Sequence, residues 1–427
     1  MKKKPCKRTL IFTGGGTGGH IYPGLAVADE LRIKNSDVRI VWIGSSRRDK
    51  VMVCAGKGEN AVASVDAFIA IPAGKLRRYF SFRTLWDAFK VAAGFFVSFF
   101  YLIRIKPVAL FSKGGFVSVM PCAAAKLLGI PVYTHECDVS PGLANRLNAR
   151  FARRLLLSYE QSRAFFPKAS PNAVSVTGNP VRPVFYTADK AKGAAFLGLT
   201  GKISKPVLLI LGGSSGAHQI NELVLQNLEW LCSRFIVVHQ TGQGEDFKKA
   251  CAAARTVNKN AIVGAKDELE FAESGQTAGS GRAAKSGSGA EVHPALYLCY
   301  DFIYADMPHV LALSDIVLSR AGANSLWECA VCAKPMVLLP LAGSGTRGDQ
   351  IENAELFEKQ NAAFVLNPRE KDGKKLSGSL CSTLEKLQDV SLRRAMGNAA
   401  FELTGKQKAA QKIADILYTE VLQNDDV

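Results

Sequence analysis

Short apolar runs alternate along the first part of the chain with longer segments whose apolar residues recur at helical spacing. An apolar run at 9–13 leads through a glycine-rich stretch to a helical pattern from Pro23, and a second run follows at 38–44. Runs of this kind, rich in Val, Ile and Leu, are typical of parallel strands that are buried on both faces. Further strands are expected at 108–112, 131–136, 155–158 and 174–178. The pattern predicts successive β-α-β units.

The alternation restarts after a proline-containing segment, Asn179–Pro183, which we interpret as a hinge. Apolar runs then recur at 206–213, 235–242, 296–303, 315–322, 335–341 and 362–366. We therefore expect an α/β protein with two Rossmann-like, doubly wound domains that face a cleft. A stretch at 272–290 is rich in Gly, Ser and Ala and has no periodic apolar face, so we predict a disordered surface insertion there.

The net charge of +17 is unevenly distributed. The segment up to Val181 holds 27 Lys and Arg against 10 Asp and Glu, whereas the rest of the chain holds 27 basic and 27 acidic residues. A basic half indicates an anionic partner, such as nucleic acid, acidic lipid or a phosphorylated substrate, and composition does not choose among them. With 48% hydrophobic and 21% charged residues, the chain is not a disordered one.

A glycine loop between the first strand and the first helix, Gly14–His20, has the G-x-G-x-x-G spacing that lets backbone N–H groups approach a diphosphate. The second strand is followed by Arg47 and Arg48, which suit a ribose 2′-phosphate, so an NADP-dependent oxidoreductase is an alternative. A second glycine-rich loop, at 212–217, has the same place between a strand and a helix in the second half of the chain. For each loop the competing interpretation is a tight turn that requires glycine.

Further motifs close strands or open helices. Ser325 and Glu328 have the spacing of a capping box, which competes with a role for Glu328 in accepting ribose hydroxyls. Gln350 and Asn353 lie at a helix start and carry amides suited to sugar hydroxyls. His135–Asp138 closes a strand. The chain contains no D-x-D pair, H-E-x-x-H motif or P-loop lysine, so we expect neither a metal nor a cofactor.

These motifs occur in the order and spacing of the MurG family of glycosyltransferases, which the chain resembles over nearly its whole length outside 272–290. They are GGGTGGHIYPGLAVADEL, KGGFVS, HECD, GNPVR, GGSSGA, SRAGANSLWE and DQIENA. The resemblance implies the GT-B architecture. It also implies an inverting enzyme that moves N-acetylglucosamine from UDP-N-acetylglucosamine to the muramyl 4-hydroxyl of lipid I, which gives lipid II in peptidoglycan synthesis.

The resemblance further implies a set of site residues. The first glycine loop is expected to contact the sugar nucleotide and the acceptor diphosphate. The second domain is expected to bind uracil through a backbone group, ribose through a glutamate and the sugar hydroxyls through a glutamine. The residues implied are Thr17, Gly18, Gly19 and His20 of the loop; Asp138; Arg182, Ser214 and Ile303 for the nucleotide; Ala323, Asn324, Ser325, Leu326, Trp327 and Glu328 for the ribose segment; and Gln350 for the sugar.

The chain departs from the family pattern at two positions. Asp138 stands where the family usually has asparagine, and Ser215 stands where it has glutamine, so that glutamine contact does not carry over. The expected reaction is a single displacement with inversion, in which a general base removes the acceptor proton as UDP departs. His20 is the first choice for this base because neutral imidazole is available near pH 7, and Asp138 is the second.

A basic and aromatic segment at 75–83 precedes Trp86, Phe89 and an uncharged apolar run at 91–103. Because a helix needs about 20 residues to span a bilayer, we interpret this run as an interfacial helix on anionic lipid, with an ordinary core helix as the alternative. We expect an acceptor- and membrane-binding domain at 1–181 with 409–427, and a UDP-sugar-binding domain at 182–408.

The expected location is peripheral, on the cytoplasmic side of the bacterial inner membrane. The expected partners are UDP-N-acetylglucosamine, lipid I and the anionic membrane surface, without nucleic acid, for which no stacking platform or groove-reading element is found. A non-catalytic basic membrane-binding protein is a further alternative.

Overall fold

The structure is a computed structural model that describes residues 8–54, 64–74, 82–199, 203–212, 217–257, 297–343 and 348–423, with the backbone alone at 82–88. The chain divides into two compact units, Met1–Pro183 with Gln407–Val427 (unit 1) and Val184–Lys406 (unit 2). The insertion predicted at 272–290 and most of the basic segment at 75–83 lie outside the described residues.

Unit 1 is built on a seven-stranded sheet with the strand order β3-β2-β1-β4-β5-β6-β7, in which all neighbouring strands are parallel. The order reverses between β1 and β4, which makes the ends of these two strands the topological switch point of a doubly wound sheet. The strands are β1 (Thr9–Thr13), β2 (Arg39–Gly44), β3 (Ala67–Ala70), β4 (Ala109–Ser112), β5 (Val132–Glu136), β6 (Arg154–Leu157) and β7 (Val174–Val176).

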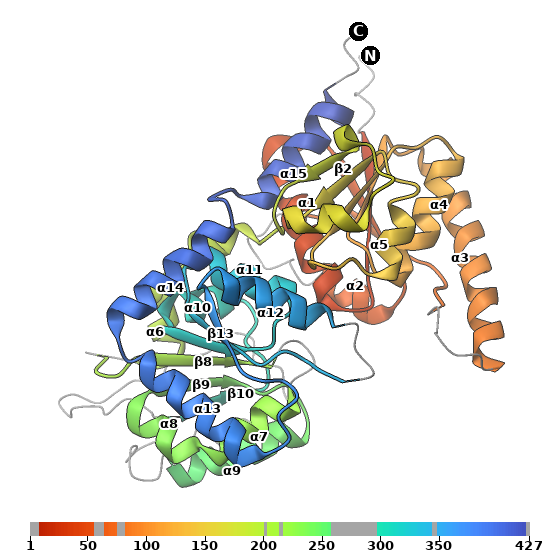
Figure 1. Cartoon of the computed structure of the whole chain (residues 1–427). Helices are drawn as coiled ribbons and strands as arrows, with labels where there is room; N and C mark the ends of the chain where they lie inside the picture. Colours follow the sequence, from red (N-terminus) through yellow and green to blue (C-terminus); the bar gives the residue numbers. More distant parts are fainter. Residues whose placement is uncertain are drawn as a thin grey trace. The chain divides into compact units, whose positions relative to one another are not determined.

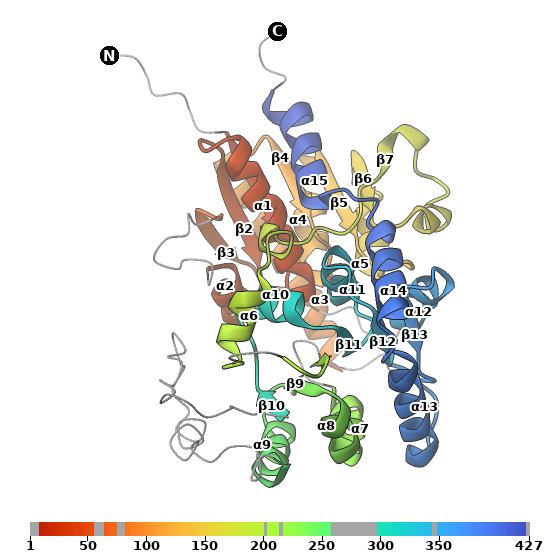
Figure 2. The same cartoon turned by 90° about the vertical axis from the view of Figure 1, so that its left-hand side faces the viewer.

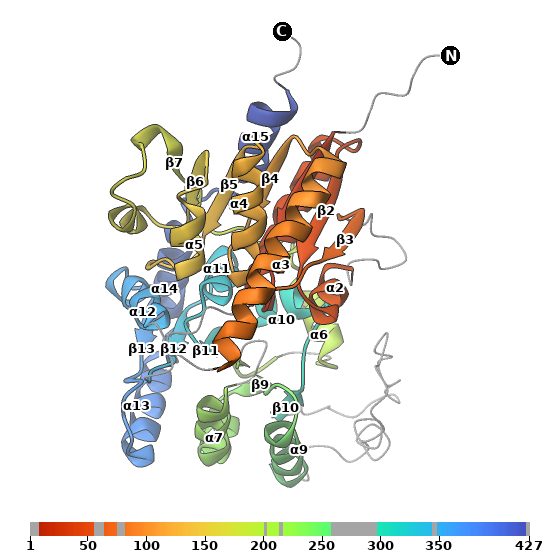
Figure 3. The ribbon, with the colours of Figure 1, turned by 90° about the vertical axis from the view of Figure 1, so that its right-hand side faces the viewer.

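Helices cover both faces of this sheet. Helices α1 (Tyr22–Lys34) and α15 (Ala409–Leu417) pack side by side over one face (Figure 2), and α3 (Phe82–Ile105) and α4 (Val119–Leu127) cover the other (Figure 3). Strand β1 shows how the sequence divides its apolar residues between two cores, because Leu10 and Phe12 pack with α1 whereas Ile11 packs towards α4. Two shorter helices, α2 (Arg47–Cys54) and α5 (Leu143–Asn148), lie beyond the strand ends.

Unit 2 repeats the plan with six parallel strands in the order β10-β9-β8-β11-β12-β13 (Figure 1). Its strands are β8 (Val207–Leu211), β9 (Ile236–Gln240), β10 (Tyr297–Tyr300), β11 (Ile316–Ser319), β12 (Met336–Leu338) and β13 (Ala363–Val365). Its helices are α6 (Lys190–Phe196), α7 (His218–Gln226), α8 (Leu228–Arg234), α9 (Glu245–Val257), α10 (Met307–Leu313), α11 (Ala323–Val331), α12 (Asp349–Lys359), α13 (Gly373–Lys386) and α14 (Val390–Leu403). The prediction of doubly wound α/β units is confirmed.

The helical segment after the second glycine loop is divided into α7 and α8 at Asn227. The Asn227 side chain donates to the carbonyl oxygen of Leu223 (2.7 Å) and to Ser377 Oγ (2.9 Å), so it competes with regular helical bonding and ties the break to α13.

The C-terminal segment completes unit 1 although it is far from the sheet in sequence. Helix α15 buries Ile413, Ala414 and Leu417 against α1, and a π-helical turn, Tyr418–Leu422, follows it. In that turn the Glu420 carboxylate accepts hydrogen bonds from Tyr133 Oη (2.9 Å) and from Arg154 Nε (2.7 Å). One carboxylate therefore joins the end of the chain to β5 and β6.

Replacing Glu420 by alanine is expected to lower the free energy of unfolding by about 1–3 kcal/mol, because it leaves the hydroxyl of the buried Tyr133 and the Arg154 guanidinium without this acceptor. Urea unfolding followed by circular dichroism measures the change. Glu402→Ala is the matched control, since the Glu402 side chain forms an exposed ion pair with Lys406 and its loss should change stability by less than about 0.5 kcal/mol. Equal effects of the two substitutions would contradict the anchoring role.

Candidate functional site

The loops that follow β1, β4 and β5 leave the same edge of the unit 1 sheet. Two of them contact each other so closely that only glycine fits: a Cβ on Gly115 would lie 2.9 Å from the Gly15 carbonyl oxygen and 3.0 Å from His20 Cδ2, and Gly115 has a φ of +80°. The His20 imidazole therefore lies against the β4 loop. Thr17 is exposed, Gly18 is buried, and Gly19 and His20 are half-buried at the end of a short 3₁₀ turn.

Two buried side chains from β2 and α2 hold the first glycine loop, and neither was singled out from the sequence. Trp42 Nε1 donates to the Gly14 carbonyl oxygen (3.0 Å). Asp49, which is 1% exposed, accepts from the Gly16 N–H (3.1 Å), from the N–H groups of Ser45 (2.9 Å) and Ser46 (3.2 Å), and from Ser45 Oγ (3.0 Å). The carboxylate thus joins the loops after β1 and β2. A short acidic residue next to two arginines gives no sequence signal of this role, because its donors are backbone groups.

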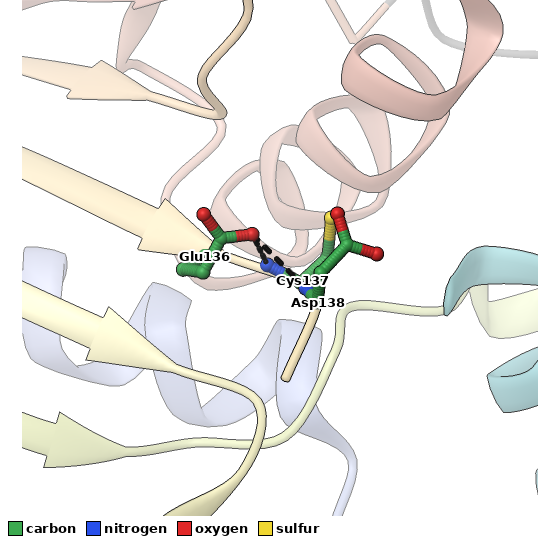
Figure 4. Close-up of side chains that lie close together, drawn as sticks. All are labelled: Glu136, Cys137 and Asp138. Carbon is green, nitrogen blue, oxygen red and sulfur yellow. Dashed lines mark hydrogen bonds between the residues drawn. The ribbon is translucent and has the colours of Figure 1, made fainter. Parts of the chain in front are cut away.

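The carboxylate of Glu136 organises the turn after β5. Its Oε1 accepts from the N–H groups of Cys137 (2.7 Å) and Asp138 (2.9 Å), as Figure 4 shows, and its Oε2 accepts from Gly142 N–H (3.2 Å) and Asn145 Nδ2 (3.0 Å). Glu136 is 2% exposed, so these four donors take the place of water. The Asp138 carboxylate lies next to the Cys137 sulfur (Figure 4), and Asp138 is half-buried. Glu136 is therefore a residue that positions Asp138.

Glu136, Cys137 and Asp138 bring three potential metal-ligand atoms within 4.8 Å of one another. The Glu136 oxygens already accept four hydrogen bonds, and burial raises the pKa of the Cys137 thiol well above its ordinary value, which favours the protonated form over the thiolate that binds metals. The donor chemistry of these residues fits a hydrogen-bonded turn better than a metal site.

Arg182 belongs to unit 1, whereas the predicted boundary places it in the second domain. Its guanidinium lies over the Tyr22 ring, with Cζ 5.6 Å from the ring centroid, so the first turn of α1 holds it. The positive charge also acts on Asp29, where burial raises the carboxyl pKa and the Ser64 hydroxyl and Arg182 partly oppose that rise. The sequence pattern gave no sign that α1 would supply the contacts of this arginine.

In unit 2, the interpretation of Ser325 and Glu328 as a capping box, which competed with a ribose-binding role for Glu328, is wrong. Helix α11 has Gly322 as its N-cap and no side-chain cap, so Ser325 lies inside the first turn and cannot cap the helix with Glu328. Ala323, Leu326 and Trp327 are buried, and Asn324, Ser325 and Glu328 are half-buried. Ser214 and Ser215 of the second glycine loop lie outside the described residues.

Three side chains join the loops at the carboxyl edge of the unit 2 sheet. Arg320 Nη1 donates to Gln219 Oε1 (3.2 Å) and to the carbonyl oxygens of Leu339 (2.9 Å) and Pro340 (3.3 Å), which connects β11 to α7 and β12. Asn353 Nδ2 donates to the carbonyl oxygen of Ala321 (3.3 Å). Gln350 Oε1 accepts from Leu341 N–H (3.0 Å). This bond uses the oxygen of the Gln350 amide and not its Nε2 group.

Ile303, the expected uracil-facing position, is 2% exposed, and its N–H donates to Gln240 Oε1 (2.8 Å). The backbone amide of Ile303 is thus already engaged by β9. The assignment of the uracil contact to Ile303 stays a prediction.

A buried imidazole supports the start of α7. His239 Nδ1 pairs with Tyr297 Oη (2.9 Å) and Nε2 with Asn221 Oδ1 (3.0 Å), while Asn221 Nδ2 donates to the Thr241 carbonyl oxygen (2.9 Å). Since Asn221 Oδ1 can only accept, Nε2 carries the proton and Nδ1 accepts from the tyrosine. Burial lowers the pKa of His239 to about 3, which keeps it neutral. The sequence pattern did not reveal this residue, because a histidine within a buried strand has no distinguishing spacing.

The family models that match this chain correspond to its two units. A model of the glycosyltransferase family 28 N-terminal domain matches residues 10–157, and one of the corresponding C-terminal domain matches 207–271 and 286–415. A Treponema denticola protein named UDP-N-acetylglucosamine–N-acetylmuramyl-(pentapeptide) pyrophosphoryl-undecaprenol N-acetylglucosamine transferase is 48% identical over 84% of this chain and 84% of its own length. A Treponema pallidum protein of the same name is 42% identical over 93% of this chain and 94% of its own.

Among solved structures, MurG of Acinetobacter baumannii has a similar fold, with a TM-score of 0.64 at 23% identity over 96% of this chain and 99% of that one. The parallel sheets, the matched domains and the curated relatives agree with one another. The chain therefore belongs to glycosyltransferase family 28, within the family of the N-acetylglucosamine transferases named above.

Proposed function

We propose that this protein transfers N-acetylglucosamine from UDP-N-acetylglucosamine to the muramyl 4-hydroxyl of lipid I and so forms lipid II. The observation that carries the proposal is the 48% identity, over 84% of the chain, to a protein named for this transfer. The site geometry supports it, because the loops after β1, β4 and β5 meet at one edge and hold a half-buried histidine and a half-buried carboxylate. Membership of a glycosyltransferase family argues against the two alternatives, an NADP-dependent oxidoreductase and a non-catalytic membrane-binding protein.

Radiolabel transfer from UDP-N-acetylglucosamine to a lipid I analogue tests this function directly. We expect transfer by the full chain with an excess of chelator present, because the residues expected to stabilise the departing UDP are helix N-termini and side chains of the protein. Transfer to lipid I alone, and not to a soluble muramyl peptide of the same stem, would show that the lipid diphosphate is part of the substrate. A lack of transfer by the folded wild-type protein would refute the proposal.

Unit 1 is proposed to bind the acceptor and unit 2 the donor. The excess of basic residues lies before Val181, which suits an acceptor that carries a diphosphate on an anionic surface. In unit 2, Glu328 and Gln350 lie on α11 and α12 near the carboxyl ends of β11 and β12, the edge where nucleotides bind in sheets of this kind. Arg182, on the segment that leads from unit 1 to unit 2, is proposed to contact the nucleotide.

The general base is proposed to be His20. Its Nδ1 is buried, so Nε2 is the nitrogen that can reach an acceptor hydroxyl. As the 4-oxygen attacks the anomeric carbon, Nε2 takes the hydroxyl proton and the bond to the UDP oxygen breaks. Asp138, held in place by Glu136, is the second candidate.

Two substitutions separate the candidates for the base. His20→Ala is expected to lower kcat by at least about 100-fold, the usual contribution of a general base, and Asp138→Asn by less than about tenfold, because it restores the amide that the family usually has there. Steady-state rates at saturating donor and acceptor provide the measurement. The opposite ranking would assign the base to Asp138, and wild-type turnover by His20→Ala would exclude His20.

We propose a peripheral location on the cytoplasmic side of the bacterial inner membrane, and a row of exposed aromatic side chains on α3 supports contact with a membrane surface. Phe89, Phe96 and Phe100 are 63%, 68% and 60% exposed, while Gly94 and Leu102 on the opposite side of the helix are buried. Exposed Lys90 adds positive charge beside them. Figure 3 shows α3 as the outer helix of its face, next to α4. In the described part of the chain, no helix combines the length and apolarity needed to cross a bilayer.

The double substitution of Phe96 and Phe100 by serine is expected to weaken binding to vesicles of anionic lipid by at least about tenfold, because each buried phenyl ring contributes about 1.5–3 kcal/mol. Vesicle sedimentation of the full chain measures this. Ile33→Ser is the control, since Ile33 is 74% exposed on α1, which covers the other face of the sheet. Equal binding of the wild type to neutral and anionic vesicles, or to neither, would contradict the membrane proposal.

A further inference from the structure

A lysine ammonium is buried at the switch point of unit 1. Lys113 directly follows β4 and is 0% exposed. Its Nζ has no oxygen or nitrogen hydrogen-bond partner among the residues that the structure describes, and its hydrogen-bonding contact is with the Cys137 thiol. The backbone of the first glycine loop lies over its side chain: a Cβ on Gly14 would be 3.4 Å from Lys113 Cβ. The Lys113 N–H also donates to the Thr13 carbonyl oxygen (2.9 Å), which fixes this position next to β1.

The charge of Lys113 reaches the neighbouring strand. Ser112 pairs with Thr134, so Lys113 is level with His135 on β5. Burial is the larger cause that lowers the pKa of His135, and the Lys113 ammonium lowers it further. Burial raises the pKa of the Cys137 thiol, and the ammonium partly opposes that rise. That thiol is a weak hydrogen-bond acceptor. The Glu136 oxygens accept four other N–H groups, so they do not pair with the ammonium.

A buried ammonium without a hydrogen-bonded counter-ion destabilises the folded chain, because its lost hydration is not replaced. Such a group is expected where a function requires its field. Lys113 lies beneath the contact between the loops that begin at Gly14 and Gly114, at the sheet edge where doubly wound folds bind ligands. In this low-dielectric setting a charge acts over several ångströms without direct contact. A compact polyanion on the outer side of the loops would complement this charge.

We propose that Lys113 provides the counter-charge for the diphosphate of the acceptor, acting through the two glycine loops without contacting it. The proposal rests on the proposed function for the identity of the acceptor. It assigns to Lys113 two opposite effects that an ordinary structural lysine would not combine. Lys113 destabilises the free protein, and it strengthens the binding of a diphosphate.

The experiment compares Lys113→Met, which removes the charge and keeps the length, with Lys126→Met, which removes an exposed charge from α4 of the same unit. Thermal unfolding of the full chain is followed with saturating UDP, so that the nucleotide site is filled, and with inorganic pyrophosphate as the probe. Lys113→Met is expected to raise the midpoint without pyrophosphate by about 3 °C or more. It is also expected to weaken pyrophosphate binding at least about tenfold, while Lys126→Met matches the wild type on both measures.

With lipid I as acceptor, Lys113→Met is expected to raise the KM for lipid I by at least about tenfold and to leave the KM for UDP-N-acetylglucosamine within about twofold. A higher lipid I KM with unchanged pyrophosphate binding would place the counter-charge effect on another part of the lipid and overturn the assignment to the diphosphate.

The proposal is also overturned if pyrophosphate does not bind the wild type, or if both Lys113→Met and a second neutral variant, Lys113→Gln, unfold at lower temperature than the wild type. In the second case the ammonium would have a stabilising partner. If the folded wild type shows no transfer, the proposed function fails, while the unfolding and pyrophosphate measurements still decide the role of Lys113.

Discussion

In a parallel sheet, every strand ends at the same edge, and both sheets of this protein are parallel throughout the strands that are described. This constraint brings together residues that are more than 100 positions apart in sequence, such as His20 after β1 and Asp138 after β5. Strand β4 lies between them, and its glycine loop contacts the loop of β1 so closely that a side chain at Gly115 would collide with both Gly15 and His20. The position of each candidate site residue in unit 1 follows from this arrangement.

The loops at this edge have few regular backbone partners, and buried polar side chains replace them. Asp49 and Glu136 each accept four hydrogen bonds, mostly from backbone N–H groups, and Arg320 performs the complementary task in unit 2 by donating to two carbonyl oxygens. Charges inside a protein are tolerated when their hydrogen-bonding capacity is filled in this way. Lys113 is the contrast, because its ammonium is equally buried and its capacity is not filled within the described structure.

The strands that were easiest to predict are those in the middle of each sheet. Strand β3 was missed because its four residues, Ala67–Ala70, are only half-buried or exposed at the edge of the sheet and give no apolar run. The capping box at Ser325 failed for a related reason. Its spacing fits a local rule, but the N-cap of the helix lies three residues earlier, at Gly322, where the turn after β11 ends.

The sequence by itself determined the parallel α/β plan of both units, since both-face burial requires continuous apolar runs and helical spacing requires periodic ones. It also determined the candidate site residues, because their motifs resemble those of one family. Only the tertiary structure showed which residues hold them: Asp49 for the first loop, Glu136 for Asp138, Tyr22 for Arg182, and Glu420 for the closing turn. These contacts join segments that are distant in sequence, or bind backbone groups that any residue carries, so no local pattern encodes them.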